Sequence, residues 1–338
     1  PRILTKIRIR DRDLEFMPVT DQDQDKLWRA LEKLRSMWGD PDIPTELFAP
    51  YQMGTAGAFR ITLWGFDKFY KLFNPRQLLT LVKLVKLIRE TGKKVEEEKL
   101  REGWDREKAH KYAEAVTTYL AIALIRYGTH TSYVSPVRAD TIMGAISAGA
   151  LTFRGVAMVW NWCEVAHIAN ITGSFVRNIK SVINGLSYLV SAVSGSSSRV
   201  KVLLDDATVL SRVGDERFDL IVTDPPYRDD VAYAELSDFY YVWLKRALSD
   251  VADIGGILVR IPRFLSEAFF ENGSEIEIQW KVFAPREVSE AEGRSRYFGS
   301  VGGREVGSFN YFKDLLARSF KSMASLLSDG GALVTYYA

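Results

Sequence analysis

Residues 218–227 combine an apolar run with groups that can bind a planar amine, reading Phe-Asp-Leu-Ile-Val-Thr-Asp-Pro-Pro-Tyr. The two prolines fix φ and lack an N–H, so the segment from Pro225 to Pro226 cannot continue a strand ladder. It leaves the Asp224 carboxylate and the Pro225 carbonyl as acceptors, and Tyr227 adds a flat face. Two acceptors and a stacking ring suit a planar group with an exocyclic NH2, such as adenine or cytosine.

The elements around this loop predict an α/β fold. The apolar half of the segment, 218–222, is typical of a buried parallel strand, and ligands bind at the carboxyl ends of such strands. Residues 200–204 predict a preceding strand that ends at Asp205-Asp206. Three further elements follow, with helices over 235–248 and 309–327 and a strand over 332–337. This alternation predicts a doubly wound, mostly parallel sheet.

The tetrapeptide Asp224-Pro225-Pro226-Tyr227 resembles the catalytic motif of the S-adenosylmethionine-dependent amino-methyltransferases. The wider sequence resembles the large archaeal and bacterial adenine-specific DNA methylases. Four more segments carry that resemblance: 72–78, 158–164, 205–208 and 233–245. It implies a Rossmann-like class I methyltransferase fold, S-adenosylmethionine as cofactor, DNA as partner and methylation of a flipped adenine at N6.

The resemblance also implies roles for single residues on the base side of the site. Asp224 and Pro225 would accept hydrogen bonds from the target amine, Pro226 would fix the loop, and Tyr227 would stack on the base. Hydrogen bonding would turn the amine lone pair towards the methyl sulfonium, and positioning and electrostatics would supply most of the rate. No covalent intermediate is required.

The cofactor side is assigned to three residues. Asp206 matches the position that accepts a hydrogen bond from the cofactor's adenine amine, with Asp205 as the neighbour most easily confused with it. Asn74 and Arg76 match a segment that packs beside the cofactor pocket. Each has a structural alternative, because Asp206 can cap a helix that follows the strand and Asn74-Pro75 can simply begin a helix.

One expected motif is absent. These enzymes carry a Phe-x-Gly-x-Gly-like loop whose glycines let the backbone approach the methionine moiety, and no segment here matches it. In the resembled family that loop precedes the segments named above. The chain also begins with Pro1 on a strand-like run. We therefore expect a fragment or processed product that lacks an N-terminal segment, or a partner chain that carries the glycine loop.

Composition narrows the other possibilities. A net charge of +2 gives little support to simple electrostatic nucleic-acid binding. The single cysteine, Cys163, predicts a reducing cytoplasmic location, and it does not lie in the Pro-Cys context of cytosine-C5 enzymes. The histidines are scattered, so no metal site is expected. No apolar run is long enough for a membrane span.

The chain is expected to divide into three regions. Residues 1–45 form an extended and helical segment, 46–150 a mainly helical accessory region, and 151–338 the catalytic region. Within the last, residues 253–308 interrupt the α/β pattern with a hairpin-like insertion and a glycine-rich loop, a candidate for substrate contact.

Local patterns predict several accessory elements. Two short extended segments occupy 1–19, and amphipathic helices begin near Asp21, Asn74 and Phe175. The charge-dense stretch 93–111 has both signs, so it predicts a solvated helix and turn, not a nucleic-acid track. Core packing is expected for the two tryptophans in segment 158–164, with a wall for the base or cofactor as the alternative.

Three functions stay open at this point. The first is N6-adenine methylation of DNA. The second is the same chemistry on cytosine N4 or on an RNA base, since the motif allows all of these. The third is a non-catalytic nucleic-acid-binding module or subunit that lacks the cofactor loop.

Overall fold

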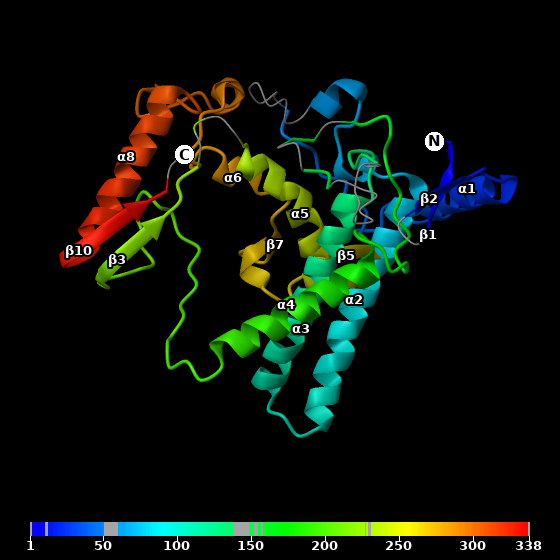
Figure 1. The fold of residues 1–338 in the computed structure, drawn as a ribbon, viewed down its shortest axis with the longest axis horizontal. Helices are drawn as coiled ribbons and strands as arrows, with labels where there is room; N and C mark the ends of the chain where they lie inside the picture. Colours follow the sequence, from blue (N-terminus) through cyan, green and yellow to red (C-terminus); the bar gives the residue numbers. More distant parts are fainter. Residues whose placement is uncertain are drawn as a thin grey trace.

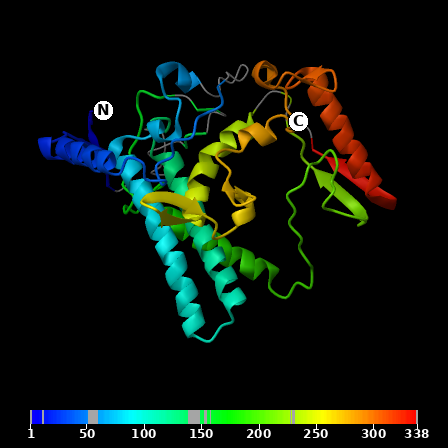
Figure 2. The ribbon, with the colours of Figure 1, turned by 180° about the vertical axis from the view of Figure 1, so that it is seen from behind.

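The computed structural model describes residues 2–10, 13–50, 60–137, 149–151, 155–156, 158–226, 228 and 231–336 (Figure 1). Long helices fill the centre and lower end of the view. A small strand pair and the last helix lie together at one side, and the N-terminal elements lie at the other. The same separation is seen from behind (Figure 2).

A helical hairpin forms the largest unit. α2 (Pro75–Arg101) and α3 (Arg106–His130) run antiparallel and pack along their lengths. Asn74 caps α2 and Pro75 takes its first position, as the sequence predicts. Residues at helical spacing, such as Leu81 on α2 and Leu124 on α3, are fully buried between them. The core of the protein is centred on this hairpin.

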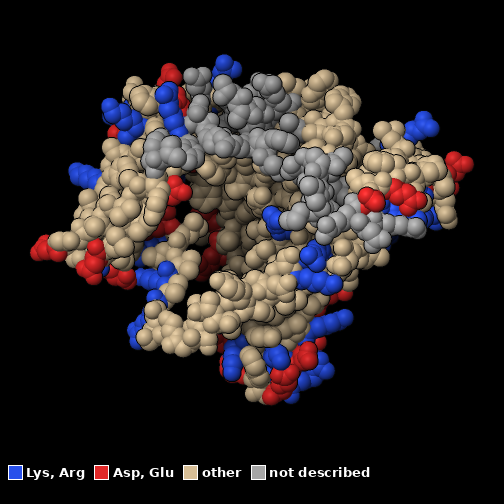
Figure 3. Space-filling model, in the orientation of Figure 1, with Lys and Arg blue, Asp and Glu red and all other residues tan. Residues whose placement is uncertain are grey.

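The turn of this hairpin carries the charge-dense stretch 93–111. Lys and Arg side chains alternate with Asp and Glu at the lower end of the molecule (Figure 3). The prediction of a solvated helix and turn is confirmed, and the mixed signs do not form a basic track.

The N-terminal region matches the predicted pattern. β1 (Lys6–Arg10) and β2 (Asp13–Met17) pair antiparallel. α1 (Asp21–Ser36) follows, and Thr20 forms a capping box with Asp23 at its start.

Two further helices pack on α3. The first half of α4 (Phe175–Val193) contacts α3, whereas its second half extends away with its apolar side chains exposed. α5 (Tyr233–Leu248) is buried along most of its length. Its Trp243 ring meets Phe73 edge to face at 5.5 Å between ring centroids, which joins α5 to the segment before α2.

Apart from one pair of parallel strands and the last helix, the remaining elements are short. Three antiparallel hairpins are β4 (Asp250–Ile254) with β5 (Ile257–Ile261), β6 (Phe270–Glu271) with β7 (Ser274–Glu275), and β8 (Ser300–Val301) with β9 (Arg304–Glu305). The short helices are η1 (Arg60–Trp64), η2 (Phe69–Leu72), η3 (Ser266–Ala268), α6 (Trp280–Phe283), η4 (Glu292–Arg294) and α7 (Ser295–Phe298).

β3 (Phe218–Thr223) pairs in parallel with β10 (Leu327–Thr335), and α8 (Phe309–Ser325) leads into β10. The register places Ile221 opposite Leu333 and Val222 opposite Val334, with an irregularity between Leu327 and Ala332. The predicted strand over 332–337 therefore begins earlier than expected and includes the Gly-Gly pair.

The sheet is smaller than predicted. The fold is mixed α/β, but β3–β10 is the one parallel pair in the part of the chain that the structure describes. The predicted strand over 200–204 is wrong, since these residues form no ladder and have no regular secondary structure. A strand exists only where a neighbour supplies backbone partners, and none of the described segments does so here.

The insertion also differs in detail. It contains the expected hairpins, but the alternating apolar residues from Ile276 to Val282 end in helix α6 instead of a strand. The α6 N-terminus is held by Asp238 of α5, whose carboxylate accepts the backbone N–H groups of Gln279 and Trp280, both at 3.0 Å. This tertiary contact overrides the local period of two.

A buried ionic network joins residues far apart in sequence. Glu46 accepts two hydrogen bonds from the Arg246 guanidinium, at 2.8 and 2.9 Å, and contacts Lys245. Asp42 accepts two from Arg89, at 2.6 and 2.7 Å. Burial opposes ionisation of both carboxyls, but these cations lower the pKa of Asp42 and Glu46 nonetheless.

Candidate active site

The Asp-Pro-Pro loop follows β3 directly. The Tyr336 N–H donates to the Thr223 carbonyl at 2.9 Å, which fixes the end of β3 against β10. Asp224 comes next and is exposed, and Pro225 and Pro226 are half-buried. Among the residues that are described, none forms a hydrogen bond or an ion pair with the Asp224 side chain. Tyr227 lies outside the described residues.

Asp206 is engaged in a local turn. Its Oδ1 accepts the N–H and the hydroxyl of Thr208, at 2.8 and 2.7 Å. Asp205 accepts the N–H groups of Asp206 and Arg212 and the Ser211 hydroxyl, and these bonds lower its pKa, the Arg212 N–H most strongly. Both carboxylates therefore cap a turn, whereas the structural alternative for Asp206 predicted a helix that the structure does not have at this place.

The turn after Asp206 is fastened to α8. The Ser322 hydroxyl donates to the Thr208 carbonyl at 2.6 Å, and Arg318 approaches the Thr208 hydroxyl at 3.4 Å. The candidate carboxylate is thus held on the layer that carries β3.

Asn74 and Arg76 meet a residue from the segment 158–164. The Asn74 amide donates to Glu164 Oε2 at 2.7 Å, and Arg76 Nη2 donates to the same oxygen at 3.0 Å. Arg76 Nε lies 2.9 Å from Glu164 Oε1, off the N–H axis, so this contact is an ion pair and not a linear hydrogen bond. Two segments that carry the family resemblance are therefore in direct contact.

The contacts that Gln77 makes beside the cluster of Asn74, Arg76 and Glu164 were not predicted from the sequence. Gln77 accepts the Asn74 N–H at 2.8 Å to complete a capping box, and its amide donates to the Cys163 carbonyl at 2.9 Å. The signal was the Gln three residues after a capping Asn. Burial raises the pKa of the Cys163 thiol to about 12, so it is not a thiolate at neutral pH.

The two tryptophans of the same segment differ. Trp162 is half-buried and meets Tyr133 edge to face at 5.0 Å between centroids. Trp160 is 79% exposed, so the prediction of core packing is wrong for it. Its neighbour in sequence, Asn161, pairs its backbone with Val137 and leaves Trp160 on the outside.

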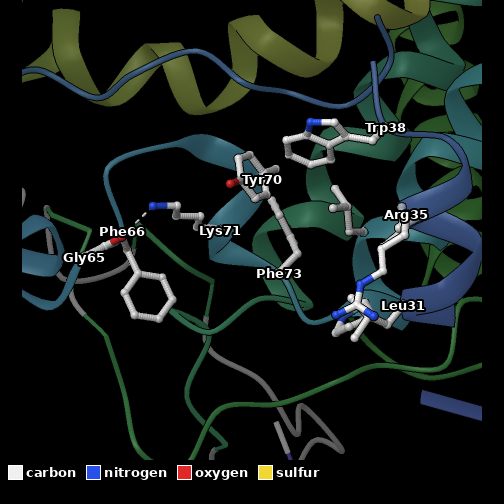
Figure 4. Close-up of a pocket in the computed structure, with 11 residues that line it drawn as sticks. Leu31, Arg35, Trp38, Gly65, Phe66, Tyr70, Lys71 and Phe73 are labelled. Carbon is white, nitrogen blue, oxygen red and sulfur yellow. Dashed lines mark hydrogen bonds between the residues drawn. The ribbon is translucent and has the colours of Figure 1, made fainter. Parts of the chain in front are cut away.

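An apolar cavity of about 590 Å³ lies beside the start of α2 (Figure 4). Trp38 and Tyr70 meet edge to face at 5.3 Å between centroids, and Phe66 lines the opposite part. Its cationic lining residues are Arg35 and Lys71, and Lys71 already binds the Gly65 carbonyl and Asp67. Its size and aromatic lining suit a small molecule, and sequence reasoning did not identify it.

The residue predicted to bind the target amine, Asp224, lies apart from two of the residues predicted to bind the cofactor, Asn74 and Arg76. β3, which carries Asp224, lies at one side of the molecule, whereas α2, which follows Asn74, lies at the other in both views (Figures 1 and 2). Asp206 is the one predicted cofactor residue on the layer of β3. The structure therefore joins Asn74 to Arg76 through Glu164 but does not bring them to Asp224.

The insertion is fastened next to the Asp-Pro-Pro loop. Glu287 accepts the backbone N–H groups of Tyr233 and Ala234, at 3.0 and 2.9 Å, at the start of α5. Burial raises the pKa of Glu287, and Arg294 binds both this carboxylate and Glu235. The part of the insertion around Glu287 is thus packed on the helix that follows the candidate site.

No family model, curated protein or solved structure matches the chain. Within the described residues, no helix is long and apolar enough to cross a membrane. The same residues contain no cluster of three or more His, Cys, Asp or Glu that could hold a metal ion.

Proposed function

We propose that the chain supplies the base-binding side of a DNA methyltransferase that acts on the exocyclic N6 amine of adenine. The observation that carries this proposal is the place of Asp224-Pro225-Pro226, directly after β3 at the carboxyl end of a parallel pair. Ligands of α/β sheets bind at that edge. The doubly wound, mostly parallel sheet of this enzyme class is part of the proposal.

The chemistry follows from the acceptors in the loop. The lone pair of an adenine amine is delocalised into the ring, which makes the nitrogen a poor nucleophile. Hydrogen bonds from the NH2 group to the Asp224 carboxylate and the Pro225 carbonyl favour tetrahedral geometry at nitrogen and free the lone pair. Asp224 is exposed and unengaged among the described residues, which leaves its oxygens available. Tyr227 would stack on the flipped base.

A chain with one cysteine also fits this chemistry. Methylation of an exocyclic amine needs no thiolate nucleophile, and the pKa of Cys163 is raised to about 12 by burial. A reducing cytoplasmic location belongs to the same proposal.

S-adenosylmethionine, the methyl donor that the resemblance implies, does not fit the described residues as they stand. Asp206 is occupied by Thr208, and Asn74 and Arg76 are occupied by Glu164 at the far side of the molecule. No Phe-x-Gly-x-Gly-like loop is present in the sequence. We propose that a further polypeptide segment, N-terminal or on a second chain, carries that loop, and that the 338 residues alone bind the cofactor weakly or not at all.

This mismatch supports a second candidate, a nucleic-acid-binding module or subunit without catalysis of its own. Cytosine N4 or an RNA base remain alternative targets of the first candidate, because the acceptors of the loop suit any of these amines.

Transfer of a labelled methyl group from S-adenosylmethionine tests the proposal. The chain is assayed alone and together with the N-terminal glycine-loop segment of a resembled methylase, on DNA in which adenine or cytosine is replaced, and on RNA. We expect transfer only in the combined sample and only to adenine in DNA. Titration calorimetry of the chain alone is expected to show affinity weaker than about micromolar, or about −8 kcal/mol.

Asp224→Ala is the test variant and Asp215→Ala, an exposed carboxylate in the preceding connection, is its control. Cofactor binding without methyl transfer in the combined sample would favour the second candidate, a nucleic-acid-binding module without catalysis. Transfer to cytosine or RNA would reassign the substrate. Equal activity of the Asp224 variant and the control would refute the role of Asp224.

A further inference from the structure

Arg228 directly follows the tetrapeptide 224–227, and one residue of the insertion holds it. The Glu290 N–H donates to the Arg228 carbonyl at 2.5 Å, and Arg228 Nε and Nη2 donate to the two oxygens of the Glu290 carboxylate. The two residues are therefore joined through the main chain and through a two-pronged ion pair. The Arg228 side chain is 54% exposed and that of Glu290 only 13%, so water screens this pair less than a pair of fully exposed side chains.

The Arg228 guanidinium also contacts the start of α8. Its Cζ lies 4.4 Å from the centroid of the Phe309 ring, where the face of the ring attracts a cation. Phe309 is the first residue of α8, which leads into β10, the partner of β3. Arg228 is thus held between the insertion and the helix that supports the β3–β10 pair.

The backbone that carries Glu290 is itself fixed. The Ala291 N–H donates to the Gly307 carbonyl at 2.7 Å. Gly307 has a φ of +80°, and a Cβ at this position would collide with the Ala291 carbonyl. Only glycine allows this conformation and this approach of two backbones without strain. Glu290 therefore has a defined position next to the start of α8.

The tetrapeptide is anchored at both ends as a result. Before it, the Thr223 carbonyl accepts the Tyr336 N–H at 2.9 Å, and after it Arg228 is bound to Glu290. Four residues separate the two anchors, and two of them are prolines, whose φ is fixed. A short segment with fixed ends and few free dihedrals has few conformations, so its acceptors keep one direction before a ligand binds.

We propose that Arg228 and Glu290 are positioning residues, whose pair fixes the direction in which Asp224 and Pro225 present their oxygens to the target amine. The inference rests on the proposed function, because it names the residues that orient that site. Glu287, three residues before Glu290, acts in the same way on the start of α5 by binding its backbone N–H groups.

A phosphate group of the nucleic acid is the rival partner for Arg228. It would compete with Glu290 for the same guanidinium, and two acids, Asp229 and Asp230, follow Arg228 in the sequence and disfavour an anion there. The two roles differ in sign. Removal of Glu290 would free Arg228 for a phosphate and tighten DNA binding, whereas loss of a positioning residue slows methyl transfer.

Single-turnover methyl transfer tests the pair, in the sample that combines the chain with the glycine-loop segment and unmethylated DNA of mixed sequence. We expect Glu290→Ala to slow transfer about 10- to 100-fold and to leave the DNA concentration for half-maximal rate nearly unchanged. Glu290→Gln keeps an oxygen that can accept from the guanidinium and should recover most of this loss. Glu305→Ala, an exposed glutamate in β9 of the same insertion, is the control and should keep the wild-type rate.

Amide hydrogen exchange reads the contact in the chain alone, without cofactor or DNA. Arg228→Ala should speed exchange of the Glu290 N–H at least about tenfold, because this group donates to the carbonyl of residue 228. Exchange in α2 should not change, which distinguishes local release from unfolding. Arg296→Ala removes an exposed cation of α7 and is the control.

A wild-type rate in Glu290→Ala, or unchanged exchange at Glu290 in Arg228→Ala, would overturn the proposal. So would tighter DNA binding by Glu290→Ala at an unchanged rate, because that result would assign Arg228 to phosphate. Absence of transfer by the wild type would refute the proposed function instead. Exchange at Glu290 would then decide alone whether the pair anchors the loop.

Discussion

The carboxyl of Asp238 on α5 should make the stability of the protein depend on pH near neutrality. It is fully buried and accepts the N–H groups of Gln279 and Trp280, both at 3.0 Å. Burial raises its pKa from 3.8 to about 7, despite these two hydrogen bonds. The folded protein therefore keeps a proton on Asp238 in a range where the unfolded chain has already released it. Asp238→Asn removes this titration.

The sign and size follow from linkage. The folded state binds more protons between the two pKa values, so the free energy of unfolding falls as pH rises through this range. Between about pH 5 and about pH 7, the titration of Asp238 alone lowers the free energy of unfolding by about 2 kcal/mol. Above about pH 8 it lowers this free energy little further. The amide of the variant does not titrate, so its stability should lack this slope, whatever its absolute stability.

Urea denaturation followed by tryptophan fluorescence at a series of pH values measures the effect. At each pH the free energy of unfolding of Asp238→Asn is subtracted from that of the wild type. The change of this difference with pH reports the titration of Asp238. Asp215→Asn, an exposed carboxyl, serves as control and should follow the wild type. Parallel curves for wild type and Asp238→Asn would show that the buried carboxyl is ionised at all these pH values, and the reasoning from burial would be wrong.

The other predictions concern single carboxylates. Glu46→Ala leaves the buried Arg246 guanidinium without its partner and should lower the free energy of unfolding by about 3–5 kcal/mol in urea denaturation. In the sample that combines the chain with the glycine-loop segment, Asp224→Ala should lower kcat by about two to three orders of magnitude with cofactor affinity nearly unchanged, as measured by single-turnover transfer and calorimetry. In the same sample, Asp206→Ala should weaken S-adenosylmethionine binding by about 1.5–3 kcal/mol and Asp205→Ala by much less; equal losses would leave Asp206 a turn residue only.

The sequence predicted the elements whose signals are local. Asn74-Pro75 marks the start of α2 because a cap and a first-turn proline act within a few residues. The apolar run of β3 and the proline stop after it were identified for the same reason. In the candidate site, the loop position of Asp224 followed from these signals alone.

What could not be predicted depends on partners far away in sequence. The contact of Glu164 with Asn74 joins residues 90 positions apart, and no spacing rule reports it. The segment 200–204 has the composition of a strand, but pairing needs a neighbour that its own residues do not specify. Residues 276–282 alternate like a strand and still end in α6, because Asp238 supplies the acceptors that start a helix.

The pairing of Glu46 with Arg246 has a consequence for how the chain folds. The two residues are 200 positions apart, so closing this contact encloses most of the helical core. At synthesis rates of about 5–20 residues per second, Glu46 would be synthesised about 10–40 s before Arg246. Until then the segment that bears Glu46 can pair only with nearby residues such as Asp67 and Phe69, and its carboxylate lacks the Arg246 partner. We expect this part of the protein to reach its native arrangement late, with the rate set by a long-range closure instead of by helix formation.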